Sequence, residues 1–338
     1  MAYMDNLDKA VEAVKAQFPG MELLEHEPMS AHSSFRIGGP VRALAVPEDA
    51  EALTRVCGIL RQCGVAPFIL GNGTNILFPD EGLSGLFILS TEKLQRMSLL
   101  PDGAVGAEAG VSLARLSAFA QENGLAGLEF AGGIPGTLGG GCIMNAGAYG
   151  GELKDVIESV TFFSVPDQAL RELPGADCGF GYRQSRFQKT PGCIVLSAVL
   201  RLERDDPQAI AERMHVLGEK RRSKQPLDLP SAGSAFRRPP GYFAAALIEE
   251  AGLKGCAVGG AQVSEKHAGF IVNRGGATSH DVCDLMAHVC RTVRARSGVL
   301  LEPEIIILPP DYRPEDSGPQ IPRSRVTAAP EPCGEQEC

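Results

Sequence analysis

Apolar residues near the start of the chain occur alternately at helical spacing and in short continuous runs. These patterns predict helices over 5–18 and 47–64 and strands over 41–46, 67–71 and 85–90. The unit formed by the second helix and the strands on either side of it has the usual length of a crossover between parallel strands. We therefore expect those two strands to run parallel in one sheet.

The next part of the chain, up to about residue 205, is richer in strands. It predicts a helix over 112–124 and strands over 103–110, 156–165 and 192–203. The last of these strands is too rich in branched apolar residues for a surface helix.

After Asp205 the pattern becomes mainly helical. It predicts helices over 207–226, 242–252 and 278–298 and strands over 268–273 and 299–308. This change predicts a separate α/β lobe over 206–308, whose final strand could return to the sheet of the middle region. Residues 309–338 contain seven prolines and no periodic apolar pattern, so we expect this tail to be disordered.

Composition excludes several classes of function. The net charge of −9 and the pI of about 5.3 argue against nucleic-acid binding. No apolar stretch is long enough for a membrane span, and the N-terminus does not resemble a signal peptide, so a cytoplasmic location is expected. Ten cysteines in such a chain are expected to be reduced, and their spacings fit no metal site.

Two glycine-rich segments carry the first chemical signal. "GNGTN" (71–75) follows a predicted strand, and the run 131–152 holds nine glycines in twenty-two residues. Neither fits a dinucleotide-binding Rossmann fingerprint, because 71–75 lacks the third glycine and Pro135 interrupts the longer run. Bare backbone amides suit a diphosphate. We therefore expect these glycines to make room for a large phosphate-bearing cofactor.

Seven motifs then occur in a fixed order over roughly residues 25–308. They are "SSFRIGGP", "GNGTNIL", "AGGIPGTLGG…NAGAYG", "GYRQSRF", "SAGSAFRRP", "VSEKHAGFIVN" and "LEPEI". The series resembles the UDP-N-acetylenolpyruvoylglucosamine reductase family, in its shorter subtype that lacks an extra tyrosine-bearing insertion. Where some members of that family have asparagine, this chain has Arg238.

The resemblance implies an α+β protein with a vanillyl-alcohol-oxidase (PCMH) type of FAD-binding fold. Two α/β subdomains, 1–95 and 96–205, would hold FAD tightly but non-covalently, and a C-terminal α/β domain over 206–308 would bind substrate. The implied reaction reduces UDP-N-acetyl-enolpyruvylglucosamine to UDP-N-acetylmuramate with NADPH, in a protein that is monomeric or weakly oligomeric. The implied FAD-binding residues are Arg36, Gly71, Asn72, Gly73, Thr74, Asn75, Ile134, Pro135, Gly136, Thr137, Gly140, Ile143, Gly147 and Ala148.

Three catalytic residues follow from the same resemblance. Arg183 would hold the substrate carboxylate, because a guanidinium binds a carboxylate through two parallel hydrogen bonds. Ser234 would donate a proton to carbon, and Glu304 would assist Arg183 in stabilising charge or in protonation. Arg186 lies in the same motif as Arg183 and is expected to be structural.

Substrate contacts are expected from another set of residues. Lys224 is the main candidate for the substrate diphosphate, with Arg221 as its weaker neighbour. The other expected substrate-binding residues are Tyr149, Tyr182 and His267.

Two other functions stay open at this point. One is a flavin oxidase of the same fold that uses O₂, which the absence of His and Cys from 71–75 disfavours, because such oxidases often attach FAD covalently. The other is a non-catalytic binder of flavin or nucleotide sugars. The presence of Arg183, Ser234 and Glu304 together argues against a non-catalytic protein.

Overall fold

The computed structural model describes residues 2–314 and is α+β, as expected. Its N-terminal sheet has the order β1-β2-β5-β3. The elements of this region are α1 (Ala2–Gln17), β1 (Glu22–Glu25), η1 (Met29–Ala31), β2 (Val41–Val46), α2 (Ala50–Gln62), β3 (Phe68–Leu70), β4 (Ile76–Leu77) and β5 (Leu83–Ser90). Strands β2 and β3 both pair with β5 in parallel, which confirms the expected parallel arrangement. Helix α2 begins three residues after Pro47 because the Asp49 carboxylate accepts a hydrogen bond from the Ala52 amide.

The second sheet is antiparallel, with the order β12-β11-β13-β7-β6. Its region comprises β6 (Met97–Leu99), β7 (Val105–Glu108), α3 (Leu113–Glu122), β8 (Leu125–Ala126), η2 (Glu129–Ala131), β11 (Ile157–Ser164), β12 (Ala169–Pro174), η4 (Gly175–Cys178), α5 (Arg186–Lys189), β13 (Cys193–Leu200) and β14 (Glu203–Arg204). One continuous apolar core joins the two regions, with Leu53 of α2 and Phe87 of β5 from the first and Val160 of β11 and Leu200 of β13 from the second.

The glycine run contains a helix that its residue pattern did not predict. Helix α4 (Leu138–Met144) begins after Thr137, whose hydroxyl accepts a hydrogen bond from the Gly140 amide, and ends at Asn145. It forms despite three glycines because tertiary packing stabilises it. The run continues through β9 (Gly147–Ala148), β10 (Gly151–Glu152) and η3 (Leu153–Asp155).

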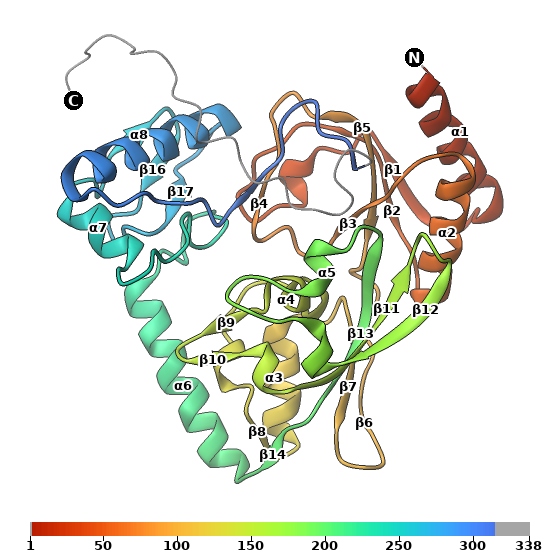
Figure 1. Cartoon of the computed structure of the whole chain (residues 1–338), viewed down its shortest axis with the longest axis horizontal. Coiled ribbons are helices and arrows are strands. Elements are labelled where there is room, and N and C mark those ends of the chain that lie inside the picture. The colour runs from red at the N-terminus through yellow and green to blue at the C-terminus, as the bar shows by residue number, and fades with distance from the viewer. Residues whose placement is uncertain (1, 315–338) are drawn as a thin grey trace.

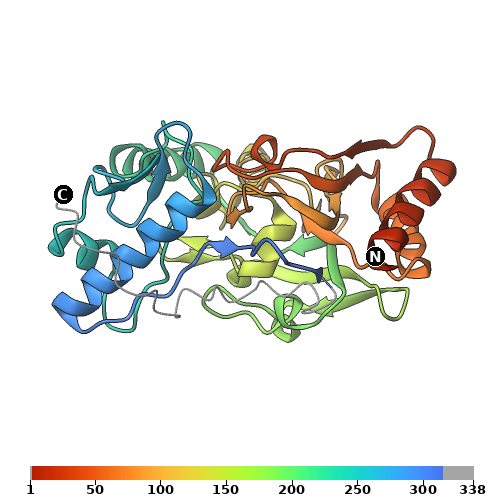
Figure 2. The same cartoon turned by 90° about the horizontal axis from the view of Figure 1, so that it is seen from above.

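Helix α6 (Pro207–Lys224) leads from the second sheet to the C-terminal lobe (Figure 1). The lobe comprises α7 (Ala244–Glu250), β15 (Ala257–Val258), β16 (Ala261–Val263), β17 (Ile271–Asn273) and α8 (Ser279–Ser297). The lobe lies at the end of the molecule opposite α1 and α2 (Figure 2). Its core also includes Phe35, Ile37 and Leu77 from the N-terminal region.

The prediction for the final strand was wrong in length and in partner. Only Ile306–Ile307 form a strand, β18, which pairs in parallel with β4 of the N-terminal region and not with the sheet of the middle region. Pro303 has no N–H to donate, which limits a longer ladder. The return places Glu304, two residues before β18, beside the loop 71–75, where the Asn75 Nδ2 donates to the Glu304 carbonyl over 3.3 Å.

The predicted disordered tail begins too early. Tyr312 is 6% exposed, and its ring packs edge-on against Phe68 at 6.0 Å between centroids. This aromatic contact holds residues 309–314 on the N-terminal sheet. The rest of the predicted tail, 315–338, lies outside the described residues, as do Cys333 and Cys338. The other eight cysteines are free thiols.

Within residues 2–314, no helix has both the length and the apolar character required to cross a bilayer.

Candidate active site

A cavity of about 1080 Å³ lies where the two N-terminal regions meet the C-terminal lobe. Pockets for drug-sized ligands are typically about 300–1,000 Å³, so this one suits a larger ligand or two ligands together. Every predicted site residue except Tyr182 lines it. The cavity therefore brings together residues from motifs up to about 270 positions apart in the sequence.

The two glycine-rich segments lie against each other and form one wall of the cavity. The Thr74 hydroxyl donates to the carbonyl of Pro135 over 3.4 Å. A Cβ atom at Gly71 would lie 2.7 Å from the hydroxyl oxygen of Thr137, and one at Gly136, where φ is +119°, would lie 3.0 Å from that of Thr74. Much of this wall is therefore backbone, interrupted by apolar side chains such as Ile134 and Ile143, which fits a flat, extended cofactor such as FAD.

Three residues that line the cavity have unusual backbone conformations. Arg36, Tyr149 and Arg183 have φ values of +56°, +54° and +53°. Bulky side chains rarely adopt this left-handed region, and such strain collects at functional sites. The conformations direct attention to the same three positions that the motifs selected.

Arg183 and Glu304 form an ion pair in the cavity. The Arg183 Nε donates to Glu304 Oε1 over 2.7 Å, and Nη2 contacts the carbonyl oxygen of Gly147 at 3.4 Å. Their side chains are 22% and 12% exposed. The pair thus joins the second sheet's region to the segment that returns from the C-terminal lobe.

Ser234 is held next to this pair by backbone contacts. The Glu304 amide donates to the carbonyl of Ala235 over 2.9 Å, and the Ala235 amide donates to the carbonyl of Gly269 over 2.8 Å. Ser234 itself is half-buried and lines the cavity. The three expected catalytic residues therefore converge from three separate segments.

The C-terminal end of α6 brings positive charge to the cavity. Arg221 is half-buried, and its Nε donates to Gln225 Oε1 over 2.8 Å. Its Nη1 is buried and has no hydrogen-bond partner among the described residues. Burial lowers the pKa of the Arg221 guanidinium. Lys224 also lines the cavity but is exposed.

His267 is held in a neutral form. Burial lowers the pKa of its imidazole, and Nδ1 accepts a hydrogen bond from the Gly269 amide over 3.2 Å. Its ring packs edge-on against Phe270, with 5.0 Å between centroids. The imidazole is thus fixed at the cavity wall as a neutral polar group.

Tyr182 is not brought into the cavity lining. Its side chain is exposed, and its hydroxyl accepts a hydrogen bond from the Arg238 amide over 3.1 Å. Arg186, as expected of a structural residue, does not line the cavity but begins α5.

The structure places residues at the site that were not among the predicted site residues. The segment 225–232 contributes eight lining residues, and Ser34 and Phe270 contribute two more. A signal existed for the segment, because it joins the predicted substrate-binding residue Lys224 to the motif "SAGSAFRRP", which contains Ser234.

Asn145 was not selected as a site residue, but its hydrogen bonds stabilise the backbone behind the cavity lining. It is fully buried and does not line the cavity. Its Nδ2 donates to the carbonyl of Gly181 over 3.1 Å and to Glu152 Oε2 over 3.0 Å, and its Oδ1 accepts from the Lys154 amide over 2.9 Å. The glycine run is thereby fastened to the turn that carries Arg183.

Two family models match the chain. Residues 41–173 match an FAD binding domain, and residues 225–308 match the C-terminal domain of UDP-N-acetylenolpyruvoylglucosamine reductase.

Similar proteins cover nearly the whole chain. The UDP-N-acetylenolpyruvoylglucosamine reductase of Caldanaerobacter subterraneus is 46% identical over 304 residues, which is 89% of this chain and 97% of that protein. The protein of the same name from Limosilactobacillus fermentum is 42% identical over 88% of this chain and 98% of its own length. A crystal structure of UDP-N-acetylenolpyruvylglucosamine reductase (MurB) from Thermus caldophilus has a TM-score of 0.72 and 35% identity, and the match covers 86% of this chain and 99% of that one.

Proposed function

The chain belongs to the UDP-N-acetylenolpyruvoylglucosamine reductase family, and from this premise we propose how its residues bind the substrate and carry out the reaction. The protein is an FAD-dependent oxidoreductase of peptidoglycan synthesis. It reduces UDP-N-acetyl-enolpyruvylglucosamine to UDP-N-acetylmuramate at the expense of NADPH. Bound FAD would supply the hydride-transfer chemistry that links NADPH to the substrate.

The glycine-lined wall holds the cofactor. Loop 71–75 and residues 134–148 offer it backbone and small side chains, and Arg36 adds a charged contact at the rim. The support for this assignment is the high proportion of glycine along that wall, where Gly71, Gly73, Gly136, Gly140 and Gly147 line the cavity, together with the volume of the cavity. No cysteine or histidine lies in 71–75 to attach the cofactor covalently.

Arg183 stabilises the charge that develops during reduction. The enolpyruvyl double bond receives a hydride at its methylene carbon, so negative charge builds on the neighbouring carbon and its carboxylate. A carboxylate that is already ionised accepts more charge poorly, so a fixed cation beside it lowers the barrier. Glu304 engages the Arg183 Nε over 2.7 Å, which orients the guanidinium so that its remaining N–H groups meet the substrate carboxylate.

Ser234 completes the reduction by giving its hydroxyl proton to the carbon next to the carboxylate. A serine hydroxyl is a weak acid and serves here because the developing carbanion is strongly basic. The proton is then replaced from solvent. The overall change balances, since one hydride from NADPH and one proton saturate the double bond and NADP⁺ is released.

The remaining polar residues bind the nucleotide part of the substrate. Arg221 and Lys224 contact the diphosphate, and Tyr149 and His267 line the substrate's path. Tyr182 contributes from outside the cavity rim. The enzyme acts in the cytoplasm, where nucleotide sugars and NADPH are available, as a monomer or weak oligomer.

One observation carries this assignment of roles: Arg183, Ser234 and Glu304 meet at the edge of the glycine-lined cavity from three distant segments. The test is to record the visible spectrum of the purified protein and then follow NADPH oxidation with and without the enolpyruvyl sugar nucleotide. We expect a yellow protein whose NADPH oxidation depends on that substrate. A colourless protein, or oxidation that needs only O₂, would contradict the proposal.

A further inference from the structure

Helix α6 connects the second sheet to the C-terminal lobe and has little apolar surface of its own to fix its position (Figure 1). Among its eighteen residues only Ile210 is fully buried. Beyond Ile210, the half-buried face of the helix is narrow and consists of Met214, Leu217, Gly218 and Arg221. These positions are spaced i, i+3, i+4 and i+7, so they form one stripe along the helix. Such a helix depends on specific contacts to set its register.

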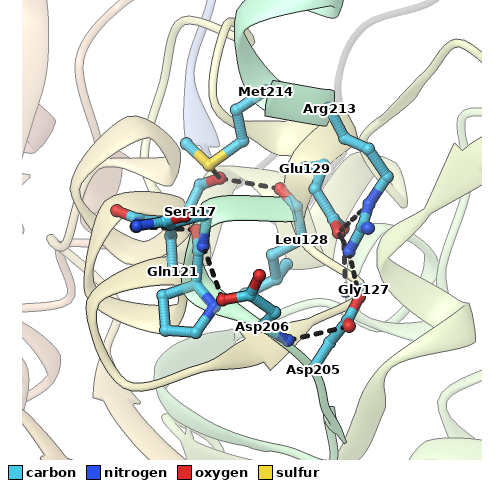
Figure 3. Close-up of polar contacts among 11 residues, drawn as sticks. Ser117, Gln121, Gly127, Leu128, Glu129, Asp205, Asp206, Arg213 and Met214 are labelled. Atoms are coloured by element: carbon cyan, nitrogen blue, oxygen red, sulfur yellow. Dashed lines mark hydrogen bonds and ion pairs between the residues drawn. The ribbon is translucent and has the colours of Figure 1, made fainter. Parts of the chain in front are cut away.

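In the N-terminal half of α6, polar contacts of Arg213 set the register of the helix (Figure 3). Arg213 donates from Nε and Nη2 to Glu129 Oε1 over 2.9 and 2.8 Å, and from Nη2 to Asp205 Oδ2 over 2.6 Å. The second oxygen of Glu129 accepts from the Gly127 amide over 2.8 Å. We call Arg213, Glu129 and Asp205 the α6 anchor.

Further contacts of the same region fix the first turns of α6 against α3 (Figure 3). Gln121 donates to the carbonyl of Pro207 over 3.1 Å, and the Ser117 hydroxyl lies 3.7 Å from the sulfur of Met214. The Asp206 carboxylate accepts from the Gln208 amide over 3.1 Å and caps the helix.

The anchor is coupled to the cavity by the short segment that follows Glu129. Glu129 lies in η2, and Gly132 and Gly133 come directly after η2. A Cβ atom at Gly132 would lie 3.3 Å from Met214 Cε, and one at Gly133 would lie 2.8 Å from Arg221 Cδ. The half-buried face of α6 therefore packs against Gly132 and Gly133. Along the helix, Arg213 of the anchor lies on the N-terminal side of this contact and Arg221 on the C-terminal side.

This packing of α6 positions Arg221 at the cavity. Its Nη1 is buried without a hydrogen-bond partner among the described residues, although Arg221 lines the cavity. A buried guanidinium that lacks an anionic partner is costly. The arrangement is stable only if the helix is held in place by other contacts, and it leaves a cation ready for an anionic ligand.

We propose that Arg213 and Glu129 are positioning residues that hold Arg221 at the diphosphate of the substrate by fixing the register of α6 on Gly132 and Gly133. The inference rests on the proposed function, since it takes the anionic ligand to be the substrate's diphosphate. It assigns to a partly exposed ion pair, remote from the reacting carbon, a role in substrate affinity.

The test is a double-mutant cycle on binding. Wild type, Arg213→Ala, Arg221→Ala and the double variant, each as flavin-loaded protein, are titrated calorimetrically with the enolpyruvyl sugar nucleotide in the absence of NADPH. No turnover occurs, so the Kd is measured directly. We expect Arg221→Ala to weaken binding about 10- to 100-fold, as for a lost charge-assisted hydrogen bond, and Arg213→Ala about 3- to 10-fold.

The double variant tests whether the anchor affects affinity through Arg221. If the anchor acts through Arg221, removing it from a protein that already lacks Arg221 changes the Kd by less than about twofold. Independent, multiplying effects in the double variant would overturn the proposal. Glu129→Gln provides a second route to the same cycle if Arg213→Ala folds poorly.

Arg201 offers a matched control. It also bridges two carboxylates, Asp102 and Glu158, at a similar side-chain exposure of 47% against 45% for Arg213. Arg201→Ala should change the melting temperature about as much as Arg213→Ala and leave the Kd unchanged; an equal loss of affinity in both would show a general structural effect and overturn the inference. A wild-type protein that does not bind this nucleotide would contradict the proposed function itself, whereas normal wild-type binding with an additive cycle would contradict only the role of the anchor.

Discussion

The two walls of the cavity are built in opposite ways. One wall is the glycine-rich surface of 71–75 and 132–148, which offers mainly backbone and a few apolar side chains. The other carries the charged and polar side chains of Arg183, Arg221, Ser234, His267 and Glu304, which come from separate segments, beside apolar residues such as Leu227 and Phe270. The first wall is encoded by contiguous stretches of sequence, whereas the second exists only once the chain has folded. The difference implies that substitutions in the first wall should affect flavin content and those in the second should affect turnover.

The glycines of the first wall also differ among themselves. A Cβ atom at Gly141 would lie 2.7 Å from Leu153 Cδ1, and one at Gly147 would lie 2.6 Å from the carbonyl oxygen of Gly151. These glycines allow the protein to pack against itself. Gly140 is exposed and lines the cavity, and a Cβ atom there would lie 3.7 Å from the Thr137 hydroxyl, which is an ordinary contact distance. Only some of the glycines therefore leave room for a cofactor.

The largest effect is expected from Ser234→Ala in the polar wall. Loss of a proton donor should slow the oxidation of reduced enzyme by substrate by about 10²- to 10⁴-fold. Reduction by NADPH and flavin content should stay within about twofold of wild type, because Ser234 does not act in that step. Stopped-flow absorbance of the two half-reactions measures this, with the exposed Ser223→Ala as control. Equal slowing of both half-reactions would contradict a role of Ser234 that is confined to the reaction with substrate.

A second substitution tests the link between the walls. Asn145→Ala leaves the Gly181 carbonyl and the Lys154 amide without their partner, and alanine must adopt the φ of +44° found at this position. Buried groups that lose a partner cost about 1–3 kcal/mol each, so we expect a loss of about 2–4 kcal/mol in the free energy of unfolding. Denaturant unfolding monitored by circular dichroism measures it.

The control for this substitution is Asn123→Ala. Asn123 is a half-buried helix-terminal asparagine with an ordinary φ of −95° and a hydrogen bond to Phe119. It should cost less than about 1 kcal/mol. A similar small cost for Asn145→Ala would mean that Asn145 does not hold the turn of Arg183.

Neighbouring glycines of α4 test the division within the first wall. Gly141→Ala overlaps Leu153 and should destabilise the protein by about 1–3 kcal/mol through overpacking. Gly140→Ala should leave the melting temperature of flavin-free protein unchanged or slightly raised, since alanine favours a helix, while flavin affinity falls. Thermal unfolding and the flavin-to-protein absorbance ratio after gel filtration separate the two outcomes. If Gly140→Ala retains full flavin, its position does not face the cofactor.

The sequence predicted the elements and the contiguous motifs better than their connections. The parallel pairing around α2 followed from local spacing, because a strand–helix–strand unit has few topologies. Helix α4 was missed because glycine-rich sequence opposes a helix locally, and its packing and the Thr137 cap outweigh that preference. The return of β18 to β4 and the hydrogen bond from Asn145 to the carbonyl of Gly181 join residues that lie 36 or more positions apart in the chain. No local pattern contains that information.

The smallest effect concerns His267, whose properties depend on burial in the polar wall. Burial, assisted by the positive charges of Lys254 and Lys224, lowers the pKa of the imidazole below its ordinary value of 6.5. As pH falls below about 6.5, the unfolded chain therefore takes up a proton at this site before the folded protein does. The stability associated with neutral His267 is present above that pH and is lost as pH falls through the lower, folded pKa.

Differential scanning fluorimetry at about pH 8 and pH 5.5 should show that acid lowers the melting temperature of wild type more than that of His267→Gln. The difference should be at most about 2–4 °C, and the exposed His215→Gln should not reproduce it. An equal loss of melting temperature in acid for wild type and His267→Gln would contradict the buried, neutral state of this residue. The pKa of His267 would then not depend on its burial in the polar wall.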